Sequence, residues 1–340
     1  MLKINNVKIS GIAVTVPSAK IDNYEFGAHL GEKEIHRLIK SIGVIKRHTA
    51  DQKTYTSDLC CDAAERLFSE LNVDKTTIGA VVLVTQSADV DIPSTSCIIQ
   101  DRLGLPSSTM AFDVNQGCSG YVYGLYIASS LMQGGMQRVL LLVGDTSSKG
   151  IDPEDKSTAL LFGDSGSATL LEQDVSATPI TFELGTDGSG WEAIVARELS
   201  HIEIDAQQAP RRKRNCTKLE MDGAAVFEFT LSRVPPLVNQ FIADNGLSAD
   251  EIDLCVYHQA NAYMLKNLAK KSKLDMAKVP MSIEEFGNTS CTSIAVTLAA
   301  RPVTDYQKSL LVGFGVGLSW GAALCDLSQT KILPIHYYQG

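Results

Sequence analysis

The residue best suited to covalent chemistry in this sequence is Cys118, which follows a short apolar run at residues 111–114 and a Gln-Gly turn. After it, apolar residues recur with helical spacing at Tyr121, Leu125, Ala128 and Met132. We therefore expect Cys118 at or near a helix N-terminus, where unpaired backbone N–H groups and the helix dipole lower the pKa of a thiol. The alternative is an inert residue that fills a strand–helix junction, as most free cysteines do.

A thiol nucleophile needs partners, namely a base or hydrogen-bond donor and an oxyanion site. His258 follows the apolar residues 254–257, and ligands bind at the carboxyl ends of strands in a doubly wound sheet. Asn288 lies in a glycine turn, and residues 313–317 form a Gly-rich loop whose backbone can approach a ligand closely. Each feature also has a structural explanation, as a buried histidine, a helix N-cap or a simple turn.

The segments that must position these residues alternate between strand and helix. Apolar runs and alternating patterns predict strands at residues 7–16, 78–85, 111–114 and 138–143. Helical spacing predicts a helix after Cys118 and others, one of them N-capped by Ser57, at residues 22–40, 57–71 and 93–103. Helices of this length between buried strands indicate βαβ units and a parallel sheet.

The second half of the chain repeats the order of the first. Residues 251–260 resemble 78–88, residues 281–298 resemble 110–125, and residues 308–315 resemble 138–145. Each half closes on a Gly-rich pair of predicted strands, at residues 160–171 and 311–327. We therefore predict two similar halves related by a pseudo-twofold: residues 1–171 with the nucleophile, and residues 172–340 with His258 and Asn288. Cys118 and Asn288 would then occupy equivalent helix starts that face one another.

Composition bounds the class of protein. A chain of 340 residues, 44% hydrophobic and 20% charged, is typical of a soluble two-domain enzyme. No apolar run reaches the roughly 20 residues of a spanning helix, and the N-terminus lacks signal-peptide features, so we expect a cytoplasmic protein.

The eight cysteines show no metal-binding spacing and are expected as thiols. A net charge of −9 argues against a nucleic-acid partner, while the run Arg211–Arg214 is either a solvated loop or a local basic surface.

Taken together, the motifs resemble a known family. Gly-Cys-Ser-Gly at 117–120, His-Gln-Ala-Asn at 258–261, Gly-Asn-Thr-Ser at 287–290 and residues 315–321 are similar to the signature of 3-oxoacyl-[acyl-carrier-protein] synthase III, in the thiolase superfamily. Residues 152–155, 161–164 and 221–223 also resemble that family, so the similarity extends over nearly the whole chain. The resemblance implies an α/β class with the thiolase-like duplicated five-layered α/β/α/β/α fold.

The resemblance also implies a Cys118–His258–Asn288 triad. Cys118 would take an acyl group from a thioester, and the backbone N–H groups of Cys118 and Gly317 would form the oxyanion hole. His258 and Asn288 would hold the thioester oxygen of malonyl-acyl carrier protein while CO₂ leaves, which is stabilisation of charge where it develops. The reaction would be a decarboxylative Claisen condensation in fatty acid or related acyl-chain biosynthesis.

Further residues are assigned by the same resemblance. Ile92, Met221, Gly223 and Asn261 would line the pantetheine and acyl tunnel, and Lys270 and Lys271 would dock the acidic acyl carrier protein. The substrates would be malonyl-acyl carrier protein and either acyl-coenzyme A or an acyl-acyl carrier protein, with no tightly bound cofactor and no metal. The family forms homodimers, and the buried-strand pattern at residues 110–114 fits a sheet that continues across a twofold axis.

Departures from the family leave the acyl donor and the reaction partly open. Arg37, Ser41, Tyr263 and Lys156 stand where the family usually grips the coenzyme A nucleotide. One alternative function is acyl transfer from Cys118 to a hydroxyl or amine without condensation, and another is a subunit of a heteromeric synthase.

Two related classes of enzyme fit less well. Biosynthetic thiolases carry a second catalytic cysteine in the final glycine loop, and no cysteine flanks Gly317 here. Long-chain elongating synthases pair the cysteine with two histidines, whereas the second partner here is Asn288. Hydroxymethylglutaryl-CoA synthase uses a catalytic glutamate ahead of the cysteine. No residue of the segment 86–91 clearly supplies one here, although Asp89 and Asp91 leave this class partly open.

Overall fold

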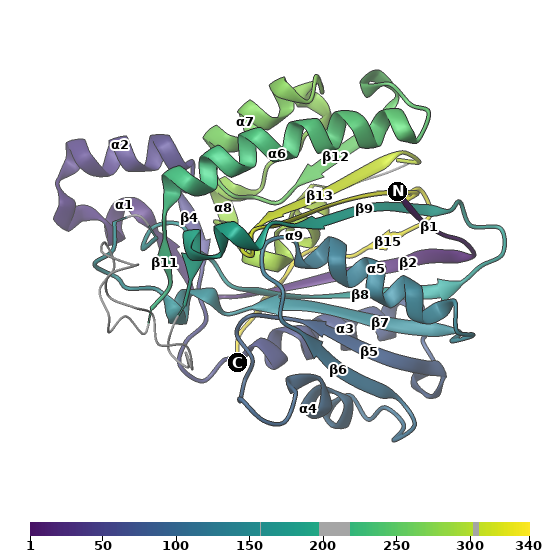
Figure 1. Ribbon diagram of the computed structural model, residues 1–340. Coiled ribbons are helices and arrows are strands. Elements are labelled where there is room, and N and C mark those ends of the chain that lie inside the picture. The colour runs from purple at the N-terminus through teal and green to yellow at the C-terminus, as the bar shows by residue number, and fades with distance from the viewer. Residues whose placement is uncertain (157, 197–217, 302–305) are drawn as a thin grey trace.

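The computed structural model describes all residues except 157, 197–217 and 302–305, and it is organised around two β-sheets stacked with helices between them and on both outer faces (Figure 1). The first sheet is 7-stranded with the order β15-β2-β8-β7-β5-β6, and β16 also pairs with β2. Its strands are β2 (Val7–Pro17), β5 (Ile78–Val84), β6 (Met110–Val114), β7 (Arg138–Asp145), β8 (Ser165–Gln173), β15 (Lys331–Ile332) and β16 (His336–Tyr338).

The second sheet is 5-stranded with the order β1-β9-β14-β13-β12. Its strands are β1 (Leu2–Ile4), β9 (Ile180–Thr186), β12 (Leu254–Tyr257), β13 (Ser309–Gly315) and β14 (Ser319–Cys325). Each end of the chain contributes to the sheet that is built mainly from the other half: the N-terminal strand β1 joins the second sheet, and the C-terminal strands β15 and β16 join the first. The division at residue 171 therefore stays a prediction.

The pairing of the strands reproduces the sequence repeat. In the first sheet β5 pairs parallel with β7, β7 antiparallel with β8, and β8 antiparallel with β2. In the second sheet β12, β13, β14 and β9 follow the same order and the same directions. The edge strand β6 has no counterpart, since residues 283–286 of the second half form a helix instead.

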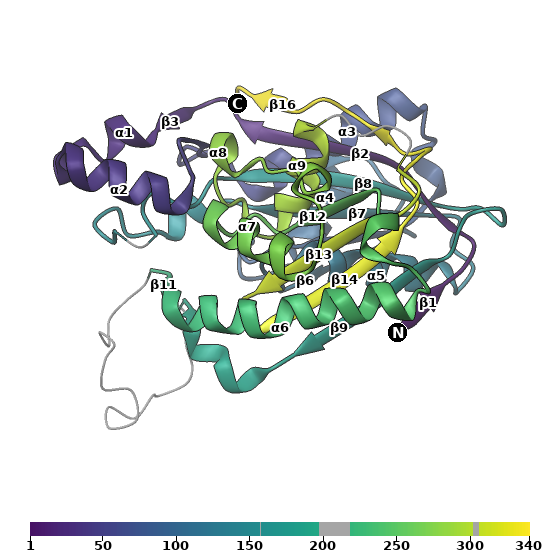
Figure 2. The same cartoon turned by 90° about the horizontal axis from the view of Figure 1, so that it is seen from above.

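The helices form three layers around the sheets. The first group, α3 (Thr56–Leu71) and α4 (Thr95–Arg102), covers the outer face of the first sheet. Between the sheets lie α5 (Gly120–Met132) and α9 (Ser293–Ala300), and the second sheet is covered by α6 (Gly223–Asp244) and α7 (Ala262–Lys271). Seen from above, α6 runs across β13 and β14 (Figure 2). This is the expected α/β/α/β/α arrangement.

The apolar strand sequences follow from this layering. On β5, Val82 and Val84 face the core between the sheets, whereas Val81 and Leu83 face the core beneath α3. Strands covered by helices on both faces must be apolar at every position, which is why residues 78–84 show no alternation. The central helix α5 is buried on most sides for the same reason, and Gly124 lets it lie close to Val84 and Leu141.

Smaller elements connect these layers. The described strands outside the two sheets pair as β3 (Lys20–Asp22) with β4 (Lys46–His48), and β10 (Ile194–Val195) with β11 (Glu220–Met221). The remaining helices are α1 (Asn23–Phe26), α2 (Glu32–Ile42), α8 (Ile283–Phe286) and the 3₁₀ turns η1 (Ala28–Leu30), η2 (Lys75–Thr77), η3 (Ser147–Gly150), η4 (Gly188–Ala193), η5 (Ala249–Glu251), η6 (Met276–Lys278) and η7 (Ser290–Thr292).

Three local predictions were wrong. The helix expected at residues 22–40 is broken at Gly27 and at Gly31, whose φ of 86° is compatible with glycine and not with a continuing helix. Ser57 lies inside α3, and the Asp58 carboxylate caps the helix by accepting the Tyr55 N–H at 2.7 Å. The strand pair expected at residues 160–171 is the single strand β8, preceded by a turn.

Several classes of feature are missing from the described part of the chain. None of its helices is long and apolar enough to cross a membrane. It contains no group of three or more His, Cys, Asp or Glu side chains arranged to hold a metal ion. The seven cysteines within it are free thiols.

The contact between β8 and α3 provides a test of this packing. A methyl group at Gly166 would lie 2.6 Å from both the Leu59 carbonyl carbon and the Cys60 nitrogen, which are backbone atoms of α3. Because backbone cannot swing aside, we expect Gly166→Ala to lower the free energy of unfolding by about 1–3 kcal/mol in denaturant titrations. Gly188→Ala is the control, since nothing lies within 4 Å of its added methyl group. Equal stability of the two variants would contradict the described packing.

Candidate active site

Cys118 lies in the turn between β6 and α5, two residues before the first helical residue, Gly120. The end of β13 passes directly over this turn. A methyl group at Gly315 would lie 2.8 Å from Cys118 Sγ, and one at Gly313 would lie 2.7 Å from the Ser119 Cα. The predicted Gly-rich loop therefore does bring its backbone against the thiol, and its glycines are required for that approach.

The protonation state of Cys118 differs from the prediction. Burial raises the pKa of the thiol to about 11, and the nearby charge of Asp145 acts in the same direction. Hydrogen bonds from the backbone N–H groups of Val316 and of Cys118 itself lower the pKa but do not compensate. The helix start thus fails to produce a resting thiolate, because desolvation outweighs the backbone donors.

The backbone N–H of the Gly-rich loop that reaches the sulfur belongs to Val316. The sequence assigned the oxyanion role to Gly317, one residue further along the chain. Val316 itself packs against the Cys118 turn, because a methyl group at Gly117 would overlap the Val316 Cγ1 atom. The structure therefore points to Val316, together with Cys118, as the source of N–H groups near the thiol.

His258 follows β12 directly and is 1% exposed. Its backbone N–H donates to Val312 O at 2.7 Å, and its ring Nδ1 lies 2.7 Å from Ser293 Oγ. The ring of Phe314 contacts the imidazole edge-on, with centroids 5.4 Å apart. Burial lowers the pKa of His258 to about 3, a shift that the Ser290 backbone offsets only in part. The imidazole is therefore neutral at neutral pH.

Asn288 is held by the backbone of the first half of the chain. Its N–H donates to Leu161 O at 2.9 Å, and its C=O accepts from Gly163 N–H at 3.1 Å. The preceding Gly287 has a φ of 68°, and a methyl group there would lie 2.7 Å from Leu161 O, so glycine is required. The Asn288 Oδ1 accepts from Ser290 N–H at 2.9 Å, which leaves the Nδ2 amide group as a donor.

The segments that carry the three residues meet where the central helices begin. A methyl group at Gly120, the first residue of α5, would lie 3.0 Å from the Cβ of Cys291, which belongs to η7 just after Asn288. His258 joins the same junction through its contact with Ser293, the first residue of α9. The arrangement brings the turn of a protonated thiol against the segments that carry two uncharged hydrogen-bonding side chains. Such a set suits acyl transfer and the stabilisation of a developing oxyanion.

The other predicted site residues are placed as follows. Met221 ends β11, Gly223 begins α6, and Asn261 is the N-cap of α7, with its Oδ1 accepting from Met264 N–H at 2.7 Å. Ile92 is 88% exposed in the single chain, and its place in the tunnel stays a prediction. Its loop is exposed and leads into α4.

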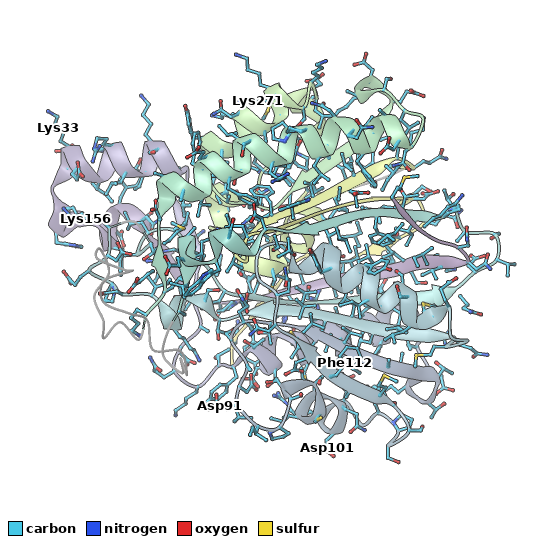
Figure 3. The ribbon with its side chains drawn as sticks, in the orientation of Figure 1. Lys33, Asp91, Asp101, Phe112, Lys156 and Lys271 are labelled. Atoms are coloured by element: carbon cyan, nitrogen blue, oxygen red, sulfur yellow. The ribbon has the colours of Figure 1, made fainter. Side chains whose placement is uncertain are left out.

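The basic residues of α7 lie on the surface. Lys270 and Lys271 form the last turn of α7 and are exposed, and Lys271 points away from the body of the protein (Figure 3). Lys156 lies below α1 and α2 (Figure 3). The Arg211–Arg214 run lies outside the described residues.

Two of the residues predicted to stand at the family's nucleotide-binding positions are an arginine that is already paired and an uncharged tyrosine. The Arg37 guanidinium forms two hydrogen bonds with the Glu34 carboxylate, at 2.9 and 2.8 Å. Tyr263 is 59% exposed and stacks on Phe227 with ring centroids 5.8 Å apart. At these two positions a phosphate would meet a cation that is already paired and an aromatic ring.

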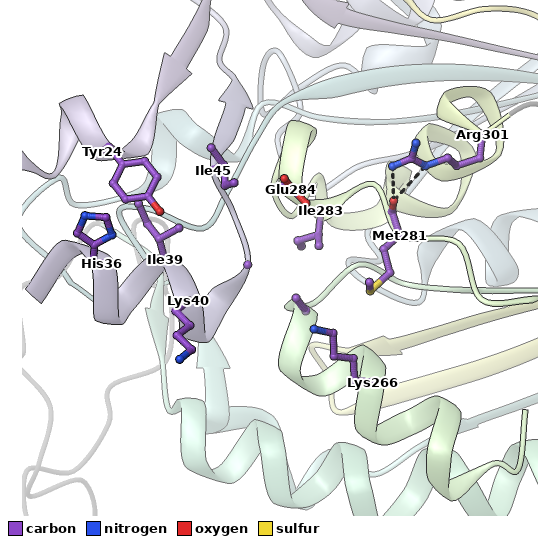
Figure 4. A pocket seen from close by; sticks show the side chains of 12 residues that line it. Tyr24, His36, Ile39, Lys40, Ile45, Lys266, Met281, Ile283, Glu284 and Arg301 are labelled. Atoms are coloured by element: carbon purple, nitrogen blue, oxygen red, sulfur yellow. Dashed lines mark hydrogen bonds between the residues drawn. The ribbon is translucent and has the colours of Figure 1, made fainter. Parts of the chain in front are cut away.

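Two surface cavities lie away from the thiol. One of about 690 Å³ lies between α2, α7 and α8, with Tyr24, Ile39, Ile283 and Arg301 among the residues that line it (Figure 4). Another of about 340 Å³ includes Arg47, Lys149 and Lys218. Neither lining includes a member of the predicted triad, so neither is the predicted acyl tunnel.

Sequence reasoning missed several residues that position the triad. Ser293 contacts His258, Phe314 packs on its ring, and Leu161 and Gly163 hold Asn288. The Gly-rich pattern around Phe314 pointed to that loop. No local pattern marked Ser293, because its role comes from a contact between segments far apart in the chain. Leu161 and Gly163 lie in the segment 161–164 that resembles the family, but that resemblance did not show that they hold Asn288.

Comparisons with known proteins point to one family. Family models described as 3-oxoacyl-[acyl-carrier-protein (ACP)] synthase III and its C-terminal part match residues 112–188 and 242–327. A Campylobacter jejuni protein, named provisionally as 3-oxoacyl-[acyl-carrier-protein] synthase 3, is 37% identical over 99% of this chain and 98% of its own length. The beta-ketoacyl-[acyl-carrier-protein] synthase III of Neisseria gonorrhoeae is 30% identical over 93% of this chain and 98% of its own. A crystal structure of 3-oxoacyl-(acyl-carrier protein) synthase from Burkholderia xenovorans LB400 is similar with a TM-score of 0.94 and 36% identity, over 99% of this chain and 98% of that one.

The raised pKa of Cys118 predicts how its reactivity depends on pH. Because only the thiolate reacts, we expect the rate of iodoacetamide labelling at Cys118 to keep rising from pH 7 to pH 10. Mass spectrometry of the labelled peptide measures the rate, with exposed Cys97 as an internal reference and Cys118→Ser as the blank. A rate that levels off by pH 8 would show instead that the helix start lowers the pKa.

Proposed function

Because this chain belongs to the 3-oxoacyl-[acyl-carrier-protein] synthase III family of acyl-transferring condensing enzymes, we propose that Cys118, His258 and Asn288 carry out its two half-reactions. The overall reaction joins an acyl group to the two-carbon unit of malonyl-acyl carrier protein and releases CO₂. The product is a 3-oxoacyl-acyl carrier protein for fatty acid or related acyl-chain synthesis. The observation that carries the proposal is the meeting of the thiol turn with two neutral donors at the start of α5 and α9.

The first half-reaction is transfer of the acyl group to Cys118. The sulfur attacks the thioester carbonyl, the bond to the donor's sulfur breaks, and the donor leaves as a thiol with the proton that Cys118 gives up. The N–H groups of Cys118 and Val316 already contact the sulfur, so they are close to where the tetrahedral oxyanion forms. Since the resting thiol is protonated, its proton must leave as the donor binds.

The second half-reaction is decarboxylation and condensation. Ser293 Oγ can donate to an unprotonated Nδ1 of His258, and in that tautomer the ring proton is on Nε2. This Nε2–H and the Nδ2 group of Asn288 donate to the thioester oxygen of the malonyl group while its C–C bond to CO₂ breaks. The enolate carbon then attacks the acyl carbonyl on Cys118, the sulfur leaves as a thiolate, and a proton taken up from water restores the resting thiol. Neutral donors suit this step because they stabilise the enolate without giving up a proton to it.

Separate assays of the two half-reactions test these roles. His258→Ala and Asn288→Ala each remove one donor to the enolate oxygen, so we expect CO₂ release from malonyl-acyl carrier protein to fall about 10²–10³-fold. Acyl transfer to Cys118, followed by mass spectrometry, should change little in both variants, and Cys118→Ser should abolish it. Equal loss of both steps would mean that His258 acts mainly as a base for the thiol.

The same assay separates condensation from simple acyl transfer. Wild-type protein that is acylated at Cys118 but releases no CO₂ from malonyl-acyl carrier protein would instead favour transfer to a hydroxyl or amine. Labelling at buried Cys291 or exposed Cys97 rather than Cys118 would overturn the choice of nucleophile.

The acyl carrier protein is the family's partner, and we infer that it docks on the exposed Lys270 and Lys271 at the end of α7. The primer arrives from that carrier or from coenzyme A. The pairing of Arg37 with Glu34 and the exposed ring of Tyr263 favour a donor that needs no phosphate clamp at these positions.

A homodimer is the assembly that the first sheet supports. Strand β6 is its free edge, and Met110 on that strand is 46% exposed. An unpaired edge offers backbone donors and acceptors to an identical edge related by a twofold. The Asp113 carboxylate accepts from Thr95 N–H at 2.7 Å, so the surface loop with Ile92 is attached to this edge. A role for Ile92 in the acyl tunnel would therefore involve the site of the second copy.

Light scattering tests the dimer. At micromolar concentration the wild-type protein should have twice the chain mass of 36.7 kDa. Met110→Lys adds a charge on the free edge and should shift the mass toward the monomer. Met276→Lys is the control, because Met276 is similarly exposed at 40% but lies in η6. A monomeric wild-type protein would overturn this assembly.

A further inference from the structure

A buried carboxylate lies beside the proposed site with no role in the reaction described above. Asp145 ends β7 and is 1% exposed. Among the described residues no ion pair joins it to a lysine, arginine or histidine. A buried charge without a cation is costly unless several hydrogen bonds replace its water.

Uncharged donors surround this carboxylate. Its Oδ1 accepts from the Gln86 N–H at 2.7 Å and from the Thr85 and Ser87 hydroxyls at 3.1 Å each. Its Oδ2 accepts from the Cys291 thiol, with Sγ and Oδ2 3.1 Å apart. Both carboxylate oxygens are thus satisfied, and each one binds a different segment of the chain.

The segment on the Oδ1 side supports the nucleophile. Gln86 donates from Nε2 to the Asn115 Oδ1 at 3.0 Å, in the turn that leads to Cys118. A methyl group at Gly117 would overlap the Gln86 Oε1, so the Gln86 side chain lies directly against the residue before the thiol. The position of residues 85–87 therefore fixes one side of the Cys118 turn.

The segment on the Oδ2 side supports the carboxamide. Cys291 belongs to η7, which starts directly after the Asn288–Thr289 pair, and it packs against Gly120 at the start of α5. Through Cys291, Asp145 holds the turn whose Ser290 N–H fixes the Asn288 side chain. A single carboxylate therefore connects the turn of the thiol with the turn of its proposed partner.

We propose that Asp145 is a positioning residue of the condensing site, which locks the Cys118 turn to the Asn288 turn through Gln86 and Cys291. Among the described residues, the ionisable groups that its charge affects are Cys118, Cys60 of α3, Cys291 of η7 and Asp164 ahead of β8, all of them thiols or carboxyls. Burial is the larger cause of the raised pKa of Cys118, and the charge of Asp145 adds to it. The expected loss of condensation rests on the proposed function. The expected change in the pKa of Cys118 does not.

The test is Asp145→Asn, which keeps the shape and removes the charge. We expect iodoacetamide labelling of Cys118 at pH 8 to become several-fold faster and its pH profile to move to lower pH, at about tenfold per pKa unit. CO₂ release from malonyl-acyl carrier protein should fall, because one of the two Asp145 oxygens that accept hydrogen bonds becomes an amide group that donates. The Cys118 turn and the Asn288 turn are then no longer both held by this side chain. Labelling uses no thioester, so its outcome is independent of whether the enzyme condenses.

Asp164→Asn is the matched control. Asp164 is also fully buried and also accepts from backbone N–H groups, those of Ala50 and Ser148, at 2.7 and 2.8 Å. Its charge does not contribute to the shifted pKa of Cys118, so its removal should leave the labelling profile of Cys118 in place. An unchanged profile in Asp145→Asn, or an equal shift in both variants, would overturn the electrostatic role.

Cys291→Ala tests the positioning role without changing any charge, and it serves if Asp145→Asn fails to fold. It removes the link between Asp145 and η7, so CO₂ release should fall while acyl transfer to Cys118 persists. Unchanged CO₂ release in this variant would show that the Cys291–Asp145 contact positions nothing, and would overturn that part of the proposal.

Discussion

The close contact between the starts of α5 and η7, Gly120 against Cys291, is the constraint on which the rest of the site depends. Both segments lie between the two sheets, where no side chain at position 120 would fit. Because Cys118 precedes one segment and Asn288 the other, this contact sets where the thiol lies relative to the carboxamide. His258 joins through Ser293, which continues the chain from η7 into α9.

Burial at this junction determines which protonation states the site can use. A dry environment raises the pKa of Cys118 to about 11 and lowers that of His258 to about 3, so both are neutral at rest. The polar groups are nonetheless satisfied, with Ser293 on the imidazole and the Ser290 N–H on Asn288. A site built from neutral donors is preorganised for an oxyanion that appears only during the reaction.

Glycines make the junction possible, since they let strand β13 and the loops pass within backbone distance of the reacting groups. Gly313 and Gly315 admit the Cys118 turn, and Gly287 admits the Leu161 carbonyl that orients Asn288. In each case a single methyl group would push apart two segments that must touch. The sequence motifs therefore have a steric meaning in addition to their chemical one.

The sequence by itself determined the strands, the repeat and the candidate triad, because apolar periodicity and short motifs are local properties of the chain. It also led to the family, and with it the layered fold. Only the tertiary structure decided the neutral state of Cys118, the place of the Val316 N–H near the thiol, the exposure of Ile92 and the break in the helix expected at residues 22–40. Burial and charge at Cys118 come from segments as distant as Asp145 and Val316, and no local pattern encodes their meeting.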